Sequence, residues 1–279
     1  MKVVPIAADS LGVRSMATYV ETKELKIFID PGAALGPSRY SLPPAKEEWQ
    51  ALDKAYQEID RVAKLCDVLI ISHYHYDHHD PNSDFYKGKK VFAKNRLENI
   101  NLSQKERGKY FEERVIEKCK LVYCDSQEFE FKNLKIKFSE PFYHGVERTR
   151  LGFVLMTSIE ENNKFKFLYT SDVQGPVSKR CCEYIIKEKP DLLYVDGPPT
   201  LFLGWKFSYK NLEVAIENLL RIIKELNCEI ILDHHLLRDL RYKELLSRVY
   251  AKGNVKSCAE YLGVALNMLE ARRKELWSK

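Results

Sequence analysis

The alternation of apolar and polar positions predicts β-structure near the N-terminus and again in the middle of the chain. Residues 2–29 contain three strand-like runs, KVVPIA, MATYVET and KIFID. QEFEF and LKIKF then alternate strictly on either side of Lys132-Asn133, as two strands of a hairpin do. Two further strands, 151–158 and 164–170, would be joined by a turn at 160–163. The QEFEF–LKIKF hairpin would turn five apolar side chains toward one core: Phe129, Phe131, Leu134, Ile136 and Phe138.

Short apolar runs predict strands that are buried on both faces, as in the middle of an α/β layered domain. These runs are VLII at 68–71, DLLYV at 191–195 and CEIIL at 228–232, and KKVFA at 89–93 predicts a further short strand. Helical patterns lie between the strands. Four helices are predicted: 45–65, 94–118 with an interruption at Gly108, 177–187 and 208–226.

The C-terminal segment, residues 236–279, is predicted to be helical. A helix over 236–250 would break at Gly253. Ser257-Cys258-Ala259-Glu260 then has the spacing of a capping box, which opens a helix. In that final helix Leu262, Leu266 and Leu269 would face inward.

The strand at 68–71 runs directly into the most polar stretch of the chain, SHYHYDHHD. Four of the seven histidines lie here: His73, His75, His78 and His79. Extended backbone at the end of a strand would turn His73 and His75 to one side, where two imidazoles can hold a cation. Asp77 and His78, about one turn later, could face a second cation beside the first. A polar surface loop rich in histidine is the alternative interpretation.

Four more polar sites follow predicted strands. Asp30 precedes Pro31-Gly32, His144 follows the strand that ends near Pro141, and Asp172 follows Thr170-Ser171. By themselves, these residues could be a turn cap, an incidental loop histidine and a helix N-cap. The last strand ends in Asp233-His234-His235, where alternation would let only one histidine point inward.

The composition of the chain indicates its class of protein, but says little about its activity. A chain of 279 residues with 45% hydrophobic residues can form one domain with a full core, which we expect to span 1–279. No apolar run approaches the ~20 residues of a membrane span, and the N-terminus lacks a signal-peptide core, so a cytoplasmic protein is expected. Seven cysteines without a C-x-x-C pair suggest reduced core residues. The net charge of +5 permits an anionic substrate but does not require nucleic acid.

The pattern H-x-H-x-D-H after an apolar strand, with polar residues at later strand ends in the same order, resembles the signature of the metallo-β-lactamase fold superfamily, most of all its uncharacterised archaeal branch of predicted hydrolases. The resemblance implies a four-layer αββα sandwich of two mixed sheets with the metals at one edge. Its ligand set would be His73, His75 and His144 for one ion, Asp77, His78 and His234 (or His235) for the other, with Asp172 bridging them. Asp30 would hold the metal loop by hydrogen bonds.

The resemblance further implies a hydrolase in which two Zn²⁺ ions, or alternatively manganese or iron, lower the pKa of a bridging water toward ~7. Asp77 and Asp172 would bind metal and orient the resulting hydroxide. The substrate would be a small molecule or a nucleotide. We expect a phosphoester or phosphodiester, because Arg148 and Arg150 follow His144 closely and arginine suits phosphate oxygens. Carboxylic ester, thioester or lactone hydrolysis is the alternative, with a nuclease or a mononuclear iron dioxygenase less favoured.

Overall fold

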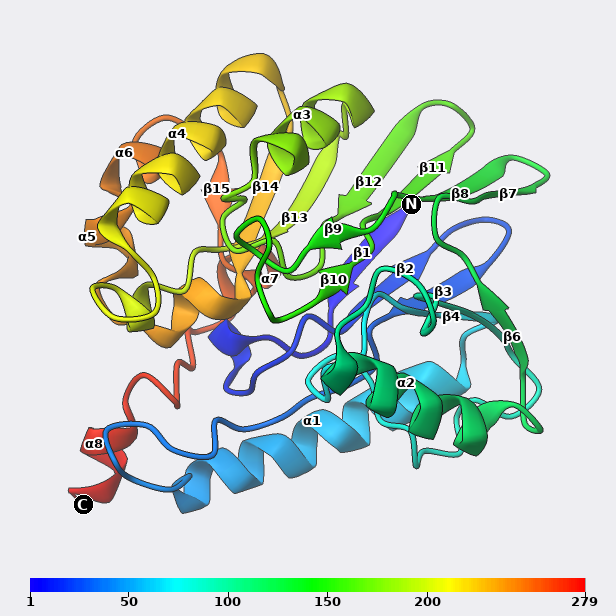
Figure 1. The fold of residues 1–279 in the computed structure, drawn as a ribbon, viewed down its shortest axis with the longest axis horizontal. Helices are drawn as coiled ribbons and strands as arrows, with labels where there is room; N and C mark the ends of the chain where they lie inside the picture. The colour runs from blue at the N-terminus through cyan, green and yellow to red at the C-terminus, as the bar shows by residue number, and fades with distance from the viewer. Residues whose placement is uncertain (279) are drawn as a thin grey trace.

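Two β-sheets pack face to face at the centre of the molecule, with helices on both outer sides (Figure 1). The computed structural model describes residues 1–278. The first sheet has six strands in the order β1-β2-β3-β4-β5-β6, antiparallel from β1 to β3 and parallel from β3 to β6. These strands are β1 (Lys2–Pro5), β2 (Thr18–Glu21), β3 (Lys26–Ile29), β4 (Val68–Ile71), β5 (Lys90–Ala93) and β6 (Lys120–Tyr123).

The second sheet is also mixed and has seven strands in the order β15-β14-β13-β12-β11-β8-β7. Strands β12 to β15 are parallel, and β7, β8, β11 and β12 pair in antiparallel fashion. A separate two-stranded ribbon consists of β9 (Phe142–Tyr143) and β10 (Phe153–Val154). The strands of the second sheet are β7 (Glu128–Phe131), β8 (Leu134–Phe138), β11 (Thr157–Glu161), β12 (Phe165–Tyr169), β13 (Leu192–Asp196), β14 (Glu229–Asp233) and β15 (Val255–Lys256).

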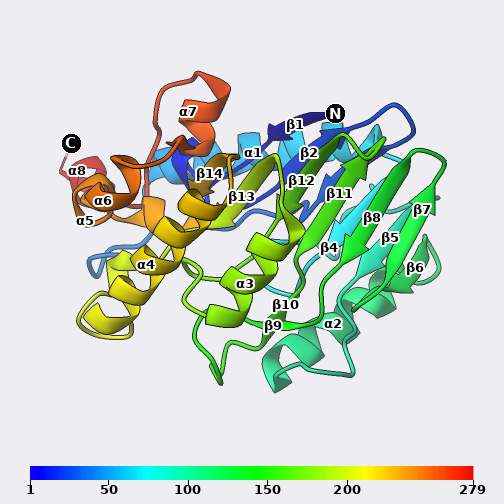
Figure 2. The same ribbon diagram turned by 90° about the horizontal axis from the view of Figure 1, so that it is seen from above.

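Helices cover the outer face of each sheet, which gives the αββα layering (Figure 2). Helices α1 and α2 pack on the first sheet, and α3 and α4 pack on the second. None of the helices within residues 1–278 is both long and apolar enough to cross a bilayer. The helices are α1 (Lys46–Lys64), α2 (Leu102–Val115), α3 (Lys179–Glu188), α4 (Tyr209–Glu225), α5 (Tyr242–Leu245), α6 (Ser247–Tyr250), α7 (Cys258–Leu262) and α8 (Arg273–Trp277), with 3₁₀ turns η1 (Asp9–Leu11), η2 (Thr200–Phe202) and η3 (His234–Arg238).

The apolar run of β4 shows why a central strand has no polar face. Val68 and Ile70 point into the core between the two sheets, whereas Leu69 and Ile71 point into the core beneath α1. Successive side chains of a strand face opposite ways, so both sets are buried. The four-layer sandwich that the sequence predicted is therefore the observed fold. The seven cysteines are all free, and five are buried.

Helix α2 corrects two predictions about residues 94–118. The helix begins only at Leu102 and continues through Gly108 to Val115, and β6, which was not predicted, follows it. Gly108 does not break the helix. A Cβ atom at this position would lie 2.8 Å from the ring of Tyr74, so glycine allows α2 to approach the segment after β4 closely.

The C-terminal segment is less helical than predicted. The capping box at Ser257 and Glu260 forms and opens α7, but that helix ends at Gly263, whose φ of 69° is left-handed. Leu266 is therefore exposed instead of facing inward. The predicted break near Gly253 is followed by β15, which pairs with β14.

Residues 264–278, here called the C-terminal strap, cross from the second sheet back to the loop that follows β3. Arg273 and Glu48 form a fully buried ion pair, in which Arg273 Nη2 lies 2.7 Å from Glu48 Oε1. Trp277 donates a hydrogen bond to the carbonyl of Pro43. Glu270 accepts two hydrogen bonds of 2.6 Å from Arg14, which lies just after η1. The strap thus ties together segments that are far apart in sequence.

We expect the Glu270 carboxylate to stabilise the fold in a pH-dependent way. Although burial opposes ionisation, Arg14 lowers the pKa of Glu270 to about 2. The contribution of Glu270 to the free energy of unfolding is then complete above pH 4.5, the pKa of the group in the unfolded chain. This contribution is lost as the pH falls to about 2. Glu270→Gln should therefore lower the free energy of unfolding at pH 7 by up to about 3 kcal/mol. Urea unfolding at pH 7, 4 and 2 measures the difference, and a deficit that stays constant across this range would contradict the prediction.

Candidate metal centre

The predicted site residues meet at one edge of the sandwich, because most of them follow the carboxyl ends of parallel strands. Strands β3 and β4 run parallel in one sheet, and β12, β13 and β14 run parallel in the other. Side chains beyond the carboxyl ends of such strands gather at a common edge. The site receives Asp30 after β3, residues 73–78 after β4, His144 after β9, Asp172 after β12, and His234 and His235 after β14.

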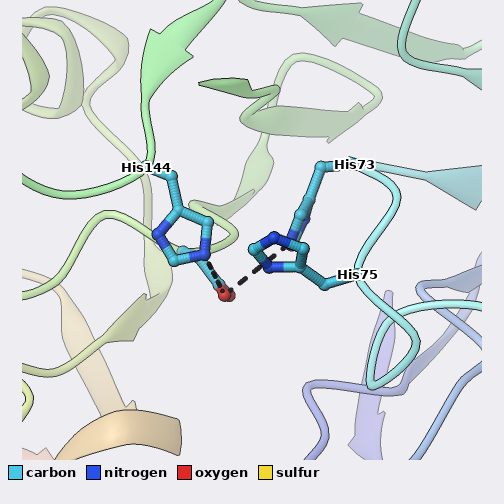
Figure 3. A group of neighbouring side chains, drawn as sticks. His73, His75 and His144 are labelled. Carbon is cyan, nitrogen blue, oxygen red and sulfur yellow. Dashed lines mark ion pairs between the residues drawn. The ribbon is translucent and has the colours of Figure 1, made fainter. Parts of the chain in front are cut away.

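The first group of side chains consists of His73, His75, His144 and Asp172. One ligand atom of each lies within 4.8 Å of the others, and the three imidazoles converge (Figure 3). Asp172 Oδ2 is 2.9 Å from His144 Nε2 and 3.7 Å from His73 Nε2. Three imidazoles and one carboxylate form a ligand set that suits zinc.

The second group consists of Asp77, His78 and His234, again with ligand atoms within 4.8 Å of one another. Asp172 borders this group as well. Its Oδ1 atom is 3.0 Å from His78 Nε2 and 3.4 Å from His234 Nε2. One carboxylate therefore directs one oxygen toward each group, which is the arrangement that a bridging ligand requires.

The chemistry of these buried atoms fits metal binding. The Nε2 atoms of His73, His78 and His144 and the Oδ1 atom of Asp172 are buried. Although His78 Nε2 and Asp172 Oδ1 are 3.0 Å apart, none of the four atoms takes part in a hydrogen bond. Buried polar atoms normally have a partner, and metal ions in the two groups would provide one for all four atoms. Burial holds the pKa of His73 well below its usual value, and burial together with His144 lowers that of His75 to about 3. These two imidazoles are thus neutral, as metal ligands must be.

The histidines of the second group have the opposite shift. Burial alone would lower the pKa of His78 and His234, but Asp172 raises both, that of His234 to about 10. Asp30 contributes further at His78. Without a metal, these imidazoles are therefore held as cations by the carboxylates around them, and a metal ion that binds here must displace their protons.

Asp30 lies where the sequence placed it, beneath the metal loop. Its carboxylate accepts hydrogen bonds from His78 Nδ1 (2.8 Å), Tyr169 OH (2.7 Å) and the backbone N–H of Ser72 (2.7 Å). The His78 contact leaves Nε2 free to bind a metal. The following Gly32 packs so closely that a Cβ atom there would lie 2.2 Å from the backbone nitrogen of His79.

Two further carboxylates that lie against the Nδ1 atoms of histidines at the centre were not predicted. Asp9 Oδ2 is 2.8 Å from His234 Nδ1, and Asp196 Oδ1 is 2.9 Å from His235 Nδ1. Asp196 ends a buried strand, a signal that could have identified it. Asp9 lies in η1 with no comparable sequence signal, since only the fold brings it to His234.

The prediction that only one of His234 and His235 points inward is wrong. Strand β14 ends at Asp233, and His234 has a left-handed φ of 61° at the start of η3. Alternation therefore does not apply, and both rings lie at the centre with centroids 4.5 Å apart. His234 belongs to the second group with Asp77 and His78, whereas His235 is grouped with Asp172 and His234 and has its Nδ1 atom on Asp196.

Arg148 and Arg150 lie in the loop between β9 and β10. The loop closes beside a site residue, because His144 N–H donates to the carbonyl of Gly152 at 3.0 Å. Asn101 at the start of α2 donates to the carbonyl of Arg150. Both arginine side chains are exposed.

Comparison with known proteins identifies close sequence relatives in archaea. No family model matches the sequence. A UPF0282 protein of Methanopyrus kandleri is 44% identical over 291 residues, with 99% of each chain covered. A UPF0282 protein of Methanocaldococcus jannaschii is 44% identical over 289 residues, with 99% of this chain and 96% of the relative covered.

Solved structures share the fold at low sequence identity. A possible metal-dependent hydrolase from Veillonella parvula has a TM-score of 0.57 at 14% identity, covering 88% of this chain and 94% of its own. An isothiocyanate hydrolase from Delia radicum gut bacteria has a TM-score of 0.56 at 14% identity, covering 92% and 95%. A metal-dependent hydrolase of the β-lactamase superfamily has a TM-score of 0.53 at 14% identity, covering 92% and 95%. With these archaeal relatives and this sandwich, the chain belongs to the UPF0282 family and has the metallo-β-lactamase fold.

Proposed function

We propose that the protein is a metal-dependent hydrolase with a dinuclear centre, in which zinc is the expected ion and manganese or iron are the alternatives. The observation that carries the proposal is the position of Asp172 between two groups of ligand atoms, with Oδ2 toward His144 and Oδ1 toward His78. A mononuclear dioxygenase would not need the second group. The hydrolases with the same fold support the class of reaction.

The residues of this chain would hold and shield the centre. His73, His75 and His144 would hold one ion, and Asp77, His78 and His234 the other. Asp30 accepts a hydrogen bond from His78 Nδ1, which fixes that ring with Nε2 facing inward. On the other ring, His234 Nδ1 lies 3.2 Å from the Ser15 carbonyl, its hydrogen-bond partner, and 2.8 Å from the Asp9 carboxylate. Asp77 keeps 17% of its side chain exposed, so it borders the solvent side. A metal pair supplies Lewis acidity and a water of lowered pKa when bound.

We expect His234, not His235, to bind the second ion. His234 Nε2 is 3.4 Å from Asp172 Oδ1 and 3.8 Å from Asp77 Oδ2. His234→Ala should therefore lose one metal per chain while His235→Ala keeps both, as measured by elemental analysis after dialysis. The neighbouring position serves as the matched control. The reverse result would make His235 the ligand.

The proposed substrate is a phosphoester or phosphodiester, of a small molecule or a nucleotide. Arg148 and Arg150 support it, because their loop closes on His144 and an exposed guanidinium there could bind an anion beside the metals. Carboxylic ester, thioester or lactone hydrolysis is the competing class.

Substitution of the two arginines tests this substrate class. Arg148→Ala and Arg150→Ala should each slow phosphodiester hydrolysis, because loss of the anion contact raises the transition-state free energy by about 1.5–3 kcal/mol. Turnover of a neutral carboxylic ester should be unchanged. Arg180→Ala, an exposed arginine on α3 that pairs with Glu140, is the control. If the wild-type enzyme hydrolyses only the carboxylic ester, the proposed phosphate substrate is wrong and the carboxylic ester class takes its place.

A further inference from the structure

A buried arginine borders only one of the two ligand groups. Arg238, in η3, has a side chain that is 4% exposed. Its Nη2 atom lies 3.3 Å from both ring nitrogens of His234 and 3.7 Å from Asp77 Oδ2. Its Nε donates to Asp9 Oδ1 at 2.7 Å. A permanent cation therefore lies beside two of the three side chains that could hold the second metal.

The distances bring this charge close to any ion in the second group. Zinc binds imidazole nitrogen at about 2.0–2.1 Å, so an ion on His234 Nε2 could be no farther than about 5.4 Å from Arg238 Nη2. Charges repel strongly at such a separation in a buried site.

In the part of the chain that the structure describes, no arginine forms an ion pair with the first group. Within residues 1–278, Asp172 forms ion pairs with histidines alone. An ion held by His73, His75 and His144 would therefore meet carboxylate charge without a nearby arginine.

We propose that Arg238 makes the centre fill in sequence: the group of His73, His75, His144 and Asp172 binds its ion tightly, and the group of Asp77, His78 and His234 binds the second ion more weakly because Arg238 repels it. Asp9 moderates this effect. It neutralises part of the guanidinium charge, and its Oδ2 atom lies 2.8 Å from His234 Nδ1, so its negative charge favours a cation on that imidazole. The inference rests on the dinuclear centre proposed above.

Titration of the metal-free full-length protein with Co²⁺, followed by visible absorption and elemental analysis, tests the inference. Wild type should bind two ions in two steps whose constants differ by about tenfold or more. His75→Ala should remove the tight step and His234→Ala the weak one. Arg238→Gln keeps hydrogen-bond donors for Asp9 but loses the charge. It should raise the affinity for the second ion about tenfold and leave the affinity for the first ion unchanged.

Three further variants separate charge from structure. Arg238→Lys keeps the charge and should keep the gap between the steps. Asp9→Asn keeps the size of the side chain but leaves Arg238 unneutralised, so the second step should weaken further. Arg241→Gln changes an exposed arginine that pairs with Asp239 and should have no effect.

Two results would overturn the inference: equal binding constants for the two ions in the wild type, or an unchanged affinity for the second ion in Arg238→Gln. If Arg238→Gln does not fold, the inference is still tested by the two binding constants of the wild type and by Asp9→Asn. A higher affinity for the second ion in Asp9→Asn also contradicts the inference. A chain that binds no metal would instead contradict the proposed function.

Discussion

Replacing Asp172 with alanine is expected to abolish tight metal binding at both ligand groups. The carboxylate is 1% exposed and lies 2.9 Å from His144 Nε2 and 3.0 Å from His78 Nε2. Loss of residues that merely orient ligands costs about 10–100-fold in metal affinity, and loss of a shared ligand should exceed that. Elemental analysis should find reduced metal per chain, and hydrolase activity should fall with it.

Asp172→Asn and Asp30→Asn complete the experiment on Asp172. The asparagine at 172 keeps the size of the side chain but loses the charge, so it should behave like alanine. Asp30→Asn changes a residue that contacts His78 from behind, and should weaken metal binding by only about 10–100-fold. Added metal should raise the Tm of wild type, because a ligand bound only to the folded state stabilises it. If Asp172→Ala shows the wild-type metal content and the same rise in Tm, Asp172 does not bridge two ions.

Replacing Arg273 with methionine is expected to lower the free energy of unfolding by about 3–5 kcal/mol, because it leaves a buried carboxylate without its partner. Arg273 and Glu48 are both fully buried. The guanidinium also donates to the carbonyls of Gly36 and Leu42, which fixes the loop after β3. Urea unfolding monitored by circular dichroism measures the change.

The neighbouring Arg272 gives a matched control for Arg273. It is 48% exposed and pairs with Glu275 on the surface, so Arg272→Met should change stability by less than about 1 kcal/mol. The double variant Arg273→Met/Glu48→Met removes both charges and should recover most of the loss. An effect of Arg273→Met no larger than that of Arg272→Met would show that the strap does not depend on this ion pair.

Local patterns in the sequence were sufficient for most elements of the fold. The β4 strand was predictable because both of its faces are buried, which requires apolar residues at every position. The hairpin of β7 and β8 was predictable because its alternation of apolar and charged residues matches a sheet with one buried face. Gly108 was misread because a glycine that allows close packing looks the same in sequence as one that ends a helix.

The sequence by itself determined which side chains could gather at the centre, since histidines and aspartates follow strand after strand. Which atoms face one another depends on contacts between distant segments, and only the tertiary structure decided that. Asp9 reaches His234 and Arg238 because η1 packs against η3, although Asp9 and Arg238 are 229 positions apart in the sequence. Likewise, the left-handed backbone at His234 turns both histidines inward. The periodicity of apolar residues indicates which face of each element is buried. It does not indicate which charged side chains pair across the fold.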